Sequence, residues 1–304
     1  MAVPSEAEVL SWFDDLSNWG RWGEDDELGT LNLITPEVRR QAATTVREGF
    51  SVSCAWEVPS RPGGLERVVT GVPMAPGMRM GYSTEQITAM TVHGYDATHL
   101  DALCHIFWDG KMYNGRPAEL VSDGGAQALP ITVARQGVIT RGVLLDVAGA
   151  RGVPWLEPSD GVVPEDLEVA EAQQGVRVGS GDAVLLRTGF GRYRQETGNL
   201  SVANSGVSQP GWHAAALPWL RERDVSVIGC DSANDVTPSG YAAIPLPVHI
   251  IGLVAMGLWL VDNCNLEGLA ATALRLSRWD FHLAICPLAL SGMTSSPVNP
   301  IATF

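Results

Sequence analysis

The order of short apolar runs and helix-like segments constrains the fold of this chain more than any other feature. Runs with the character of buried strands lie at 142–147, 182–188, 225–231 and 283–286. Segments with helical patterns or helix-end signals lie between and after them, at 164–174, 217–223, 248–260 and 265–277. Strands and helices therefore mix along the whole length, which predicts an α/β domain.

The first third of the chain carries two further structural signals. Thr35, Pro36 and Gly49 predict a surface helix over 36–49, with Thr35 as its cap and Gly49 at its end. The stretch 58–90 is rich in proline, glycine and methionine, which predicts a long loop or flap. Such a loop either covers a site or is a plain surface excursion.

The chain shows no sign of division into several domains. No change in composition, low-complexity linker or internal repeat interrupts its 304 residues. A single domain over residues 1–304 is therefore expected. We interpret the acidic, tryptophan-containing residues 1–30 as an N-terminal extension that packs on this domain or on a partner subunit.

Composition restricts the classes of partner. Hydrophobic residues make up 45% and charged residues 18% of the chain, which is enough for a substantial core. The formal net charge is −14 and the basic residues are scattered, so nucleic acid and anionic membrane surfaces are poor candidates. A small-molecule substrate is the expected partner.

Cysteine usage and the N-terminus favour a cytoplasmic location. Five widely spaced cysteines without a Cys-x-x-Cys pair predict small buried thiols in a reducing compartment. The first 29 residues contain no basic stretch followed by an apolar core, so no signal peptide is expected. The apolar run 244–261 is interrupted by Pro245, Pro247 and His249, and we interpret it as a buried helix, not a membrane span.

One short segment concentrates metal-binding residue types. Three of the six histidines, His93, His99 and His105, fall close together, with Asp101 among them. If residues 99–101 are extended, His99 and Asp101 point to the same side of the strand. That spacing presents one nitrogen and one oxygen to a single divalent ion.

A single histidine in such a segment is more often a hydrogen-bonded structural residue than a ligand. Here three surround an aspartate in a stretch that is otherwise apolar. Burial without partners would cost about 2 kcal/mol or more for each polar group. A metal ion would satisfy them together, and we therefore predict a metal site.

Other catalytic classes lack their usual motifs. The chain contains no Gly-x-Ser-x-Gly elbow, no Gly-x-x-x-x-Gly-Lys phosphate loop and no His-Glu-x-x-His pair. The sequence therefore gives no support for a serine hydrolase or a nucleotide-dependent enzyme.

The segment from Thr98 to His105 resembles the His-x-Gly-Thr-His-x-Asp-x-Pro-x-His signature of the metal-dependent cyclase family, which includes bacterial kynurenine formamidase and isatin hydrolase. Three other stretches agree with it, namely 142–147 with Arg151-Gly152, Gly181-Asp182-Ala-Val-Leu-Leu-Arg-Thr-Gly189, and Pro247-Val-His249. The resemblance spans roughly residues 20–295. It implies a single α/β domain whose mixed, partly barrel-like β-sheet is flanked by helices, a swivelling β/β/α fold.

This chain departs from the family pattern at several positions. Tyr95 stands where the family has a histidine four residues before the central one, and His93 replaces that ligand if the backbone turns differently. Ala97 and Leu103 stand where the pattern has glycine and proline. Asp262 stands where the family often places a glutamate that helps to hold a second ion.

The resemblance, together with the residue chemistry, assigns the early part of the site. His99 and Asp101 are expected metal ligands, with His93 as the third. His105 is expected to be the general base and acid. The alternative for His105 is a ligand of a second metal or a hydrogen-bond donor behind the site.

Two further candidate site residues, His249 and Asp262, lie much later in the sequence. His249 is either a further ligand, a substrate contact or a buried structural residue, and Asp262 is either a second-metal ligand or structural. The aromatic residues Tyr95, Phe107 and Trp108 are expected to pack against a planar substrate.

The resemblance implies hydrolysis of an amide or ester bond in a cyclic or aryl amide, an imide-like ring or a lactone, in the manner of an arylformamidase. Bound Zn²⁺ or Mn²⁺ would activate a water and polarise the carbonyl; zinc lowers the pKa of water from about 15.7 towards about 7. The alternatives are a metal-dependent cyclase or lyase that acts on a carbonyl substrate, and a non-catalytic metal-binding member. Family members are typically dimers or larger, so a homodimer or higher homo-oligomer is expected.

Overall fold

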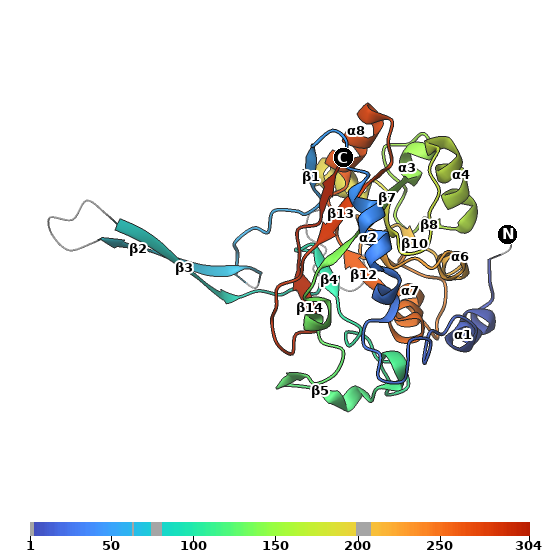
Figure 1. Cartoon of the computed structure of the whole chain (residues 1–304), viewed down its shortest axis with the longest axis horizontal. Helices are drawn as coiled ribbons and strands as arrows, with labels where there is room; N and C mark the ends of the chain where they lie inside the picture. Colours follow the sequence, from blue (N-terminus) through green and yellow to red (C-terminus); the bar gives the residue numbers. More distant parts are fainter. Residues whose placement is uncertain (1–2, 63, 74–80, 199–207) are drawn as a thin grey trace.

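The central element of the computed structural model is one mixed nine-stranded sheet (Figure 1). The structure describes residues 3–62, 64–73, 81–198 and 208–304. The sheet runs in the spatial order β1 (Ser51–Ser53), β15 (Ile301–Thr303), β13 (Asp280–Ile285), β7 (Val138–Asp146), β9 (Ala183–Arg187), β11 (Val227–Cys230), β12 (Trp259–Asp262), β4 (His99–Asp101) and β14 (Ser295–Pro297).

Neighbouring strands in the middle of this sheet are parallel. β7, β9, β11 and β12 pair in parallel, whereas the flanking strands pair antiparallel. β9, β11 and β12 are buried along their whole length, because helices and connecting segments cover both faces, as near-continuous apolar runs require. The predicted single α/β domain with a mixed, partly barrel-like sheet flanked by helices is confirmed.

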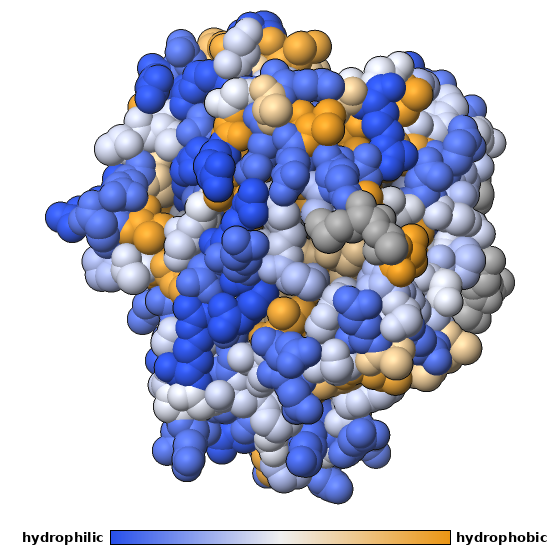
Figure 2. Space-filling model, turned by 90° about the vertical axis from the view of Figure 1, so that its right-hand side faces the viewer, coloured by the Kyte–Doolittle hydropathy of each residue, from blue (hydrophilic) through white to orange (hydrophobic). Residues whose placement is uncertain are grey.

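Helices pack on both sides of the sheet. Pro36–Ala43 (α2) packs against β7 and β13, and Pro164–Gln174 (α4) packs against β7 and against Val147–Ala150 (α3). The remaining helices are α1 (Glu6–Asp15), α5 (Phe190–Thr197), α6 (Ala216–Glu222), α7 (Pro247–His249) and α8 (Glu267–Leu276). The face that carries α1, α4 and α6 is largely hydrophilic, with separate apolar patches (Figure 2).

Short elements complete the connections. Two-stranded pairs form from β5 (Val121–Ser122) and β6 (Gly125–Ala126), and from β8 (Gly161–Val162) and β10 (Gly211–Trp212). Single-turn helices lie at η1 (Gly29–Leu33), η2 (Tyr113–Gly115), η3 (Ala118–Leu120) and η4 (Ile131–Ala134).

Residues 6–19, near the start of the chain, pack against the rest of the domain. α1 packs against the π-helix η5 (Ile250–Met256). The Asn18 side chain donates to the carbonyl of Met256 at 2.7 Å, and the Trp19 indole donates to Val254 at 2.6 Å. These contacts place residues 6–19 directly beside the element that follows His249.

The predicted loop at 58–90 is wrong in part. Two long strands, β2 (Glu66–Pro73) and β3 (Gly81–Ala89), pair antiparallel and project from the body as a ribbon (Figure 1). Residues 74–80 lie outside the described residues. The proline- and glycine-rich cluster misled the prediction, because it hid two flanking stretches that are rich in β-branched residues.

The apolar stretch 248–260 is also not one helix. The helical part ends at Met256 and Gly257 follows with a φ of 60°, after which β12 begins at Trp259. A Cβ at Gly257 would lie 2.5 Å from the Tyr113 ring, so only glycine fits this reversal. A continuous apolar run cannot by itself separate helix from strand. Within the described residues, no helix is long and apolar enough to cross a membrane.

Helix ends and cysteines differ from expectation in smaller ways. α2 ends at Ala43, well before Gly49, although Thr35 caps it as predicted by accepting from Val38. α8 begins at Glu267 with no side-chain cap from Asn265. Four cysteines are buried and unbridged as predicted, whereas Cys286 is exposed.

Candidate metal centre

The candidate site begins on β4, which lies between β12 and β14. The residues of β4 are extended as predicted: Leu100 is fully buried in the core, while His99 and Asp101 point to the other face. In the antiparallel register with β12, His99 lies opposite Asp262. Pairing of two short strands thus brings residues that are far apart in the sequence to one point.

His99 presents one unprotonated nitrogen to this point. Its Nδ1 lies 2.9 Å from the carbonyl oxygen of Ala97, and because a carbonyl only accepts, Nδ1 carries the hydrogen. In the neutral ring, Nε2 is therefore a lone-pair donor. It lies 3.5 Å from Oδ1 of Asp101 and 3.9 Å from Oδ2 of Asp262.

Asp101 is a buried carboxylate without a hydrogen-bond donor among the described residues. The residue is 0% exposed, and neither carboxylate oxygen accepts a hydrogen bond there. Burial alone would raise its pKa, but the imidazoles of His105 and His99 outweigh burial and hold the pKa well below its usual value. A buried, ionised carboxylate of this kind needs a cation.

His93 reaches the site although the family signature places its histidine at position 95. Its Nδ1 lies 3.1 Å from Oδ1 of Asp101, without hydrogen-bond geometry, and its Nε2 lies 2.9 Å from the hydroxyl of Thr294. Gly94 has a φ of 126°, and Asn263 donates to its carbonyl at 2.5 Å. This backbone reversal brings His93 into the site.

Tyr95 lies beside the site, and in the described part of the chain it forms no hydrogen bond with His99 or Asp101. Its carbonyl accepts from Arg194 at 3.3 Å. Burial, with a further contribution from Asp262, raises the pKa of its phenol, so the phenol stays protonated.

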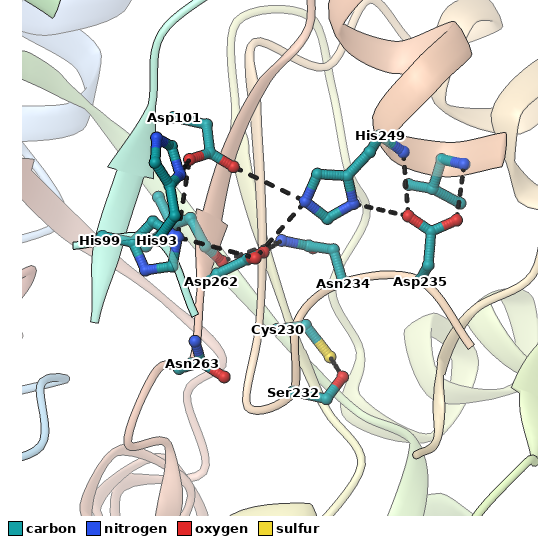
Figure 3. A network of polar contacts seen from close by, with 12 residues as sticks. His93, His99, Asp101, Cys230, Ser232, Asn234, Asp235, His249, Asp262 and Asn263 are labelled. Atoms are coloured by element: carbon teal, nitrogen blue, oxygen red, sulfur yellow. Dashed lines mark hydrogen bonds and ion pairs between the residues drawn. The ribbon is translucent and has the colours of Figure 1, made fainter. Parts of the chain in front are cut away.

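His249 enters the site from the start of α7. Its Nδ1 lies 2.6 Å from Oδ2 of Asp235, which fixes the hydrogen on Nδ1 and turns Nε2 towards the site (Figure 3). That Nε2 lies 3.6 Å from Asp101 and 3.4 Å from Asp262. Burial opposes a charge on this ring, but Asp262, Asp101 and Asp235 together raise its pKa well above the usual value. The surrounding carboxylates therefore favour positive charge here.

Asp262, at the end of β12, turns one oxygen towards the histidines and the other towards Asn234. The Asn234 side chain donates to Oδ1 of Asp262 at 2.5 Å and to the carbonyl of Val261 at 3.0 Å. Oδ2 is the atom that faces His99 and His249.

His105 stacks on His93 and is not bonded to a carboxylate. Their ring centroids lie 3.7 Å apart with planes 10° from parallel, and the His249 ring lies 6.4 Å away. Burial lowers the pKa of His105 to about 4. The ring is therefore neutral at neutral pH, which is the form that accepts a proton.

Two overlapping donor sets arise from these residues. His93, Asp101 and His105 form one, and His99, Asp101 and Asp262 form the other; in each set the ligand atoms lie within 4.8 Å of one another. Asp101 belongs to both. Imidazole nitrogens and carboxylate oxygens that converge in this way fit a divalent metal ion.

Phe107 and Trp108, the other two aromatic residues predicted to contact substrate, lie in different surroundings. Phe107 is 42% exposed. The Trp108 ring stacks on Phe13 of α1, with centroids 5.1 Å apart. A substrate contact by either ring stays a prediction.

Asp231, Asn234 and Asp235 lie at the end of and just after the strand predicted over 225–231, and they are not among the predicted site residues. Two of them, Asn234 and Asp235, contact Asp262 and His249. The available signal was their position after β11, because polar residues at the carboxyl end of a parallel strand often surround a site. Asp231 instead accepts hydrogen bonds from Thr188 and Gly189.

Comparison with known protein families tests the family resemblance that the segment from Thr98 to His105 indicated. A family model described as "Putative cyclase" matches residues 30–234. The chain belongs to the cyclase family. The matched range includes β4 and ends before His249 and Asp262.

Solved structures agree with the family assignment. A structure described as a novel cyclase is 28% identical to this cyclase-family chain, with a TM-score of 0.84 over 96% of this chain and 99% of that one. An isatin hydrolase bound to the product analogue thioisatinate is 16% identical, with a TM-score of 0.55 over 86% of this chain and 93% of that one. Isatin hydrolase A from Labrenzia aggregata, bound to benzyl benzoate, is 19% identical, with a TM-score of 0.54 over 86% and 94%. The two isatin hydrolases show the same fold. A search of curated proteins gives no match.

Proposed function

We infer that this cyclase-family member is a metal-dependent hydrolase. Its substrate class is a cyclic or aryl amide, an imide-like ring or a lactone, in which a C–N or C–O bond next to a carbonyl is cleaved. The observation that carries this inference is Asp101, a fully buried carboxylate with no hydrogen-bond donor in the described part of the chain. Such a group is costly in a protein that has no use for a cation.

The residues that would hold the ion are His99, Asp101 and His93, with His249 and Asp262 completing a second position. If bound by these residues, a divalent cation such as Zn²⁺ or Mn²⁺ would supply activation of water at neutral pH and electrostatic stabilisation of negative charge on the substrate carbonyl. The Nδ1 atoms of His99 and His249 are engaged by Ala97 and Asp235, so Nε2 is the nitrogen that each ring turns towards the ion position.

His105 supplies the proton transfers. Its ring is neutral because burial lowers its pKa to about 4, so it accepts a proton from the attacking water and returns it to the leaving nitrogen or oxygen. Its stacking on His93 holds the ring beside the ligands without using either nitrogen in an ion pair.

Tyr95, Phe107 and Trp108 are the proposed substrate contacts. Tyr95 keeps its phenol hydrogen, so it can donate to an oxygen of the substrate. The solved neighbour that holds thioisatinate, a product analogue of an isatin hydrolase, favours hydrolysis of a flat cyclic amide over other reactions.

A second candidate is a metal-dependent cyclase or lyase that acts on a carbonyl substrate. The family description and the 28% identical cyclase structure favour it. A non-catalytic metal-binding role is the third, and Tyr95 at a ligand position of the family signature favours that role.

Elemental analysis combined with a substrate screen separates these candidates. We expect stoichiometric metal in the freshly purified protein and release of a carboxylic acid from aryl formamides, cyclic amides or lactones, which chelation abolishes and metal restores. Ring closure without acid release would support the second candidate. Bound metal with no turnover of any substrate would support the third.

A further inference from the structure

Two consecutive residues after β11 contact the two late members of the candidate metal centre. Asn234 and Asp235 are both 0% exposed. Asn234 bonds to Asp262, and Asp235 bonds to His249 (Figure 3). A single turn therefore contacts side chains from two different elements, β12 and α7.

Within the described residues, the hydrogen bonds that the Asp235 carboxylate accepts all come from Val248 and His249 of α7. Oδ1 accepts from the backbone N–H of Val248 at 2.8 Å, and Oδ2 accepts from the N–H of His249 at 2.9 Å. Oδ2 also accepts from the His249 ring at 2.6 Å. The carboxylate thus fixes the backbone, the ring orientation and the tautomer of one residue at once.

The Asn234 side chain selects one oxygen of Asp262. Because its amide donates to Oδ1, Oδ2 is left to face the imidazoles of His99 and His249. The backbone of Asn234 is left-handed, with a φ of 46°, and its carbonyl accepts from Trp212 of β10 at 2.7 Å. The turn is therefore held in place from outside the site.

We propose that Asn234 and Asp235 are positioning residues that present Nε2 of His249 and Oδ2 of Asp262 to a second cation next to Asp101. They do not touch the ion themselves. As far as catalysis is concerned the inference rests on the proposed function, whereas its metal-binding part stands independently.

The test is Asp235→Asn, a change that keeps shape and removes charge. An amide offers one oxygen, so it cannot accept from both backbone N–H groups and the ring. We expect the second equivalent of Co²⁺ to bind about 10- to 100-fold more weakly, with a changed cobalt absorption spectrum. Binding of the first equivalent and the circular dichroism spectrum are expected to stay unchanged.

Asp231→Asn is the matched control, because Asp231 is equally buried after the same strand but bonds to Thr188 and Gly189. It is expected to lower the melting temperature without altering the cobalt spectrum or either binding constant. Equal effects of the two variants on Co²⁺ binding would overturn the proposal, because they would reduce Asp235 to a structural role.

Two further measurements keep the proposal testable if Asp235→Asn folds poorly. Asn234→Ala is expected to weaken the second Co²⁺ equivalent in the same direction. In a His249→Ala background, Asp235→Asn is expected to add no further loss of affinity, because Asp235 acts through His249. Additive losses in that background would contradict the inference.

The outcomes also separate this inference from the proposed function. If wild-type protein binds two Co²⁺ ions with the expected dependence on Asp235 but hydrolyses nothing, the positioning role stands and the hydrolase proposal fails. If wild-type protein hydrolyses substrate while Asp235→Asn binds Co²⁺ and turns over as wild type, the hydrolase proposal stands and the positioning role fails.

Discussion

At the scale of single residues, the site depends on the difference between Asp101 and His105. Asp101 is held ionised in a fully buried position, whereas His105, four residues later, is held neutral. Burial opposes charge on both, but only Asp101 is surrounded by imidazoles that compensate. The two residues are thus suited to opposite tasks, metal binding and proton acceptance.

The first prediction concerns Asp101→Asn. The amide keeps the shape but loses the charge shared by both donor sets, so metal affinity is expected to fall by more than roughly 100-fold, beyond the effect typical of residues behind a ligand. Metal content by elemental analysis, alongside the melting curve of the metal-free protein, is the measurement. Undiminished metal content in this variant would refute the role of Asp101.

The second prediction concerns His105→Ala. Turnover is expected to fall by roughly 100- to 10,000-fold, which is the usual contribution of a general base, while bound metal stays at the wild-type level. His282→Ala on β13 is the control, because that histidine lies on the far strand of the sheet and should leave kcat unchanged. Loss of metal from the His105 variant would instead identify the residue as a ligand.

At the scale of elements, the site depends on close contact between β10 and the turn after β11. A Cβ at Gly211 would lie 2.2 Å from the carbonyl oxygen of Asn234 and 2.8 Å from the carbonyl carbon of Asp235. The backbone N–H of Trp212 donates to the carbonyl of Asn234, and the carbonyl of Trp212 accepts from the N–H of Val236. Glycine at 211 thus lets the turn approach closely enough to reach the site.

The third prediction follows from this contact. Gly211→Ala must move the turn, so we expect a loss of roughly 1–3 kcal/mol in unfolding free energy together with weaker metal binding. Gly268→Ala on α8 is the control, since the nearest neighbour of its new Cβ is a Val52 methyl at 3.6 Å. Chemical denaturation and metal titration of both variants test this. Normal metal affinity in Gly211→Ala would show that the turn is not coupled to the site.

At the scale of the whole molecule, the proposed ion would join parts of the chain that are distant in sequence. β4, β12 and α7 each contribute side chains to the same point. An ion that binds only the folded state stabilises it according to its concentration relative to Kd.

The fourth prediction is that chelation lowers the melting temperature. At a free metal concentration about 1,000 times Kd the stabilisation is about 4 kcal/mol, which corresponds to a shift of roughly 6 °C for a domain of this size. Differential scanning fluorimetry with and without chelator measures it, and Asp101→Asn is expected to show no shift. A wild-type curve unaffected by chelator and by added metal would count against the site.

The β2–β3 ribbon is the other feature of the whole molecule, and it bears on assembly. Val68, Val69 and Ile87 are 54%, 56% and 61% exposed on it. A two-stranded ribbon alone is marginally stable in water, and contact with a partner subunit would stabilise it and cover these three side chains. We propose that at least a dimer forms through it.

The fifth prediction tests this assembly. Light scattering is expected to give at least twice the chain mass of 32.4 kDa, and the double change Val68→Lys with Ile87→Lys is expected to reduce it to one chain. Val169→Lys, at a position 48% exposed on α4, is the control and should leave the mass unchanged. A monomeric wild-type protein would refute the proposal.

Part of the structure of this protein can be predicted from its sequence, where the relation depends only on neighbouring residues. Alternation along a strand correctly placed His99 and Asp101 on one face and Leu100 in the core, because that relation needs only three adjacent residues. Likewise, the helical segment predicted at 164–174 matches α4, because a first-turn proline (Pro164) and a left-handed glycine after the last turn (Gly175) act within one helical turn.

Only the tertiary structure decided how the site closes. The register of β4 with β12 sets Asp262 opposite His99, at a separation of 163 residues that no local pattern encodes. His249 joins them from α7, where Asp235 of the turn after β11 holds its ring. His93 likewise reaches the site in place of residue 95 only because the backbone turns at Gly94. Asn263, which follows β12, holds that turn by donating to the Gly94 carbonyl. The sequence by itself determines which side chains are present and how they alternate over short distances. Whether their charges meet in one site depends on the pairing of strands that are distant in the sequence.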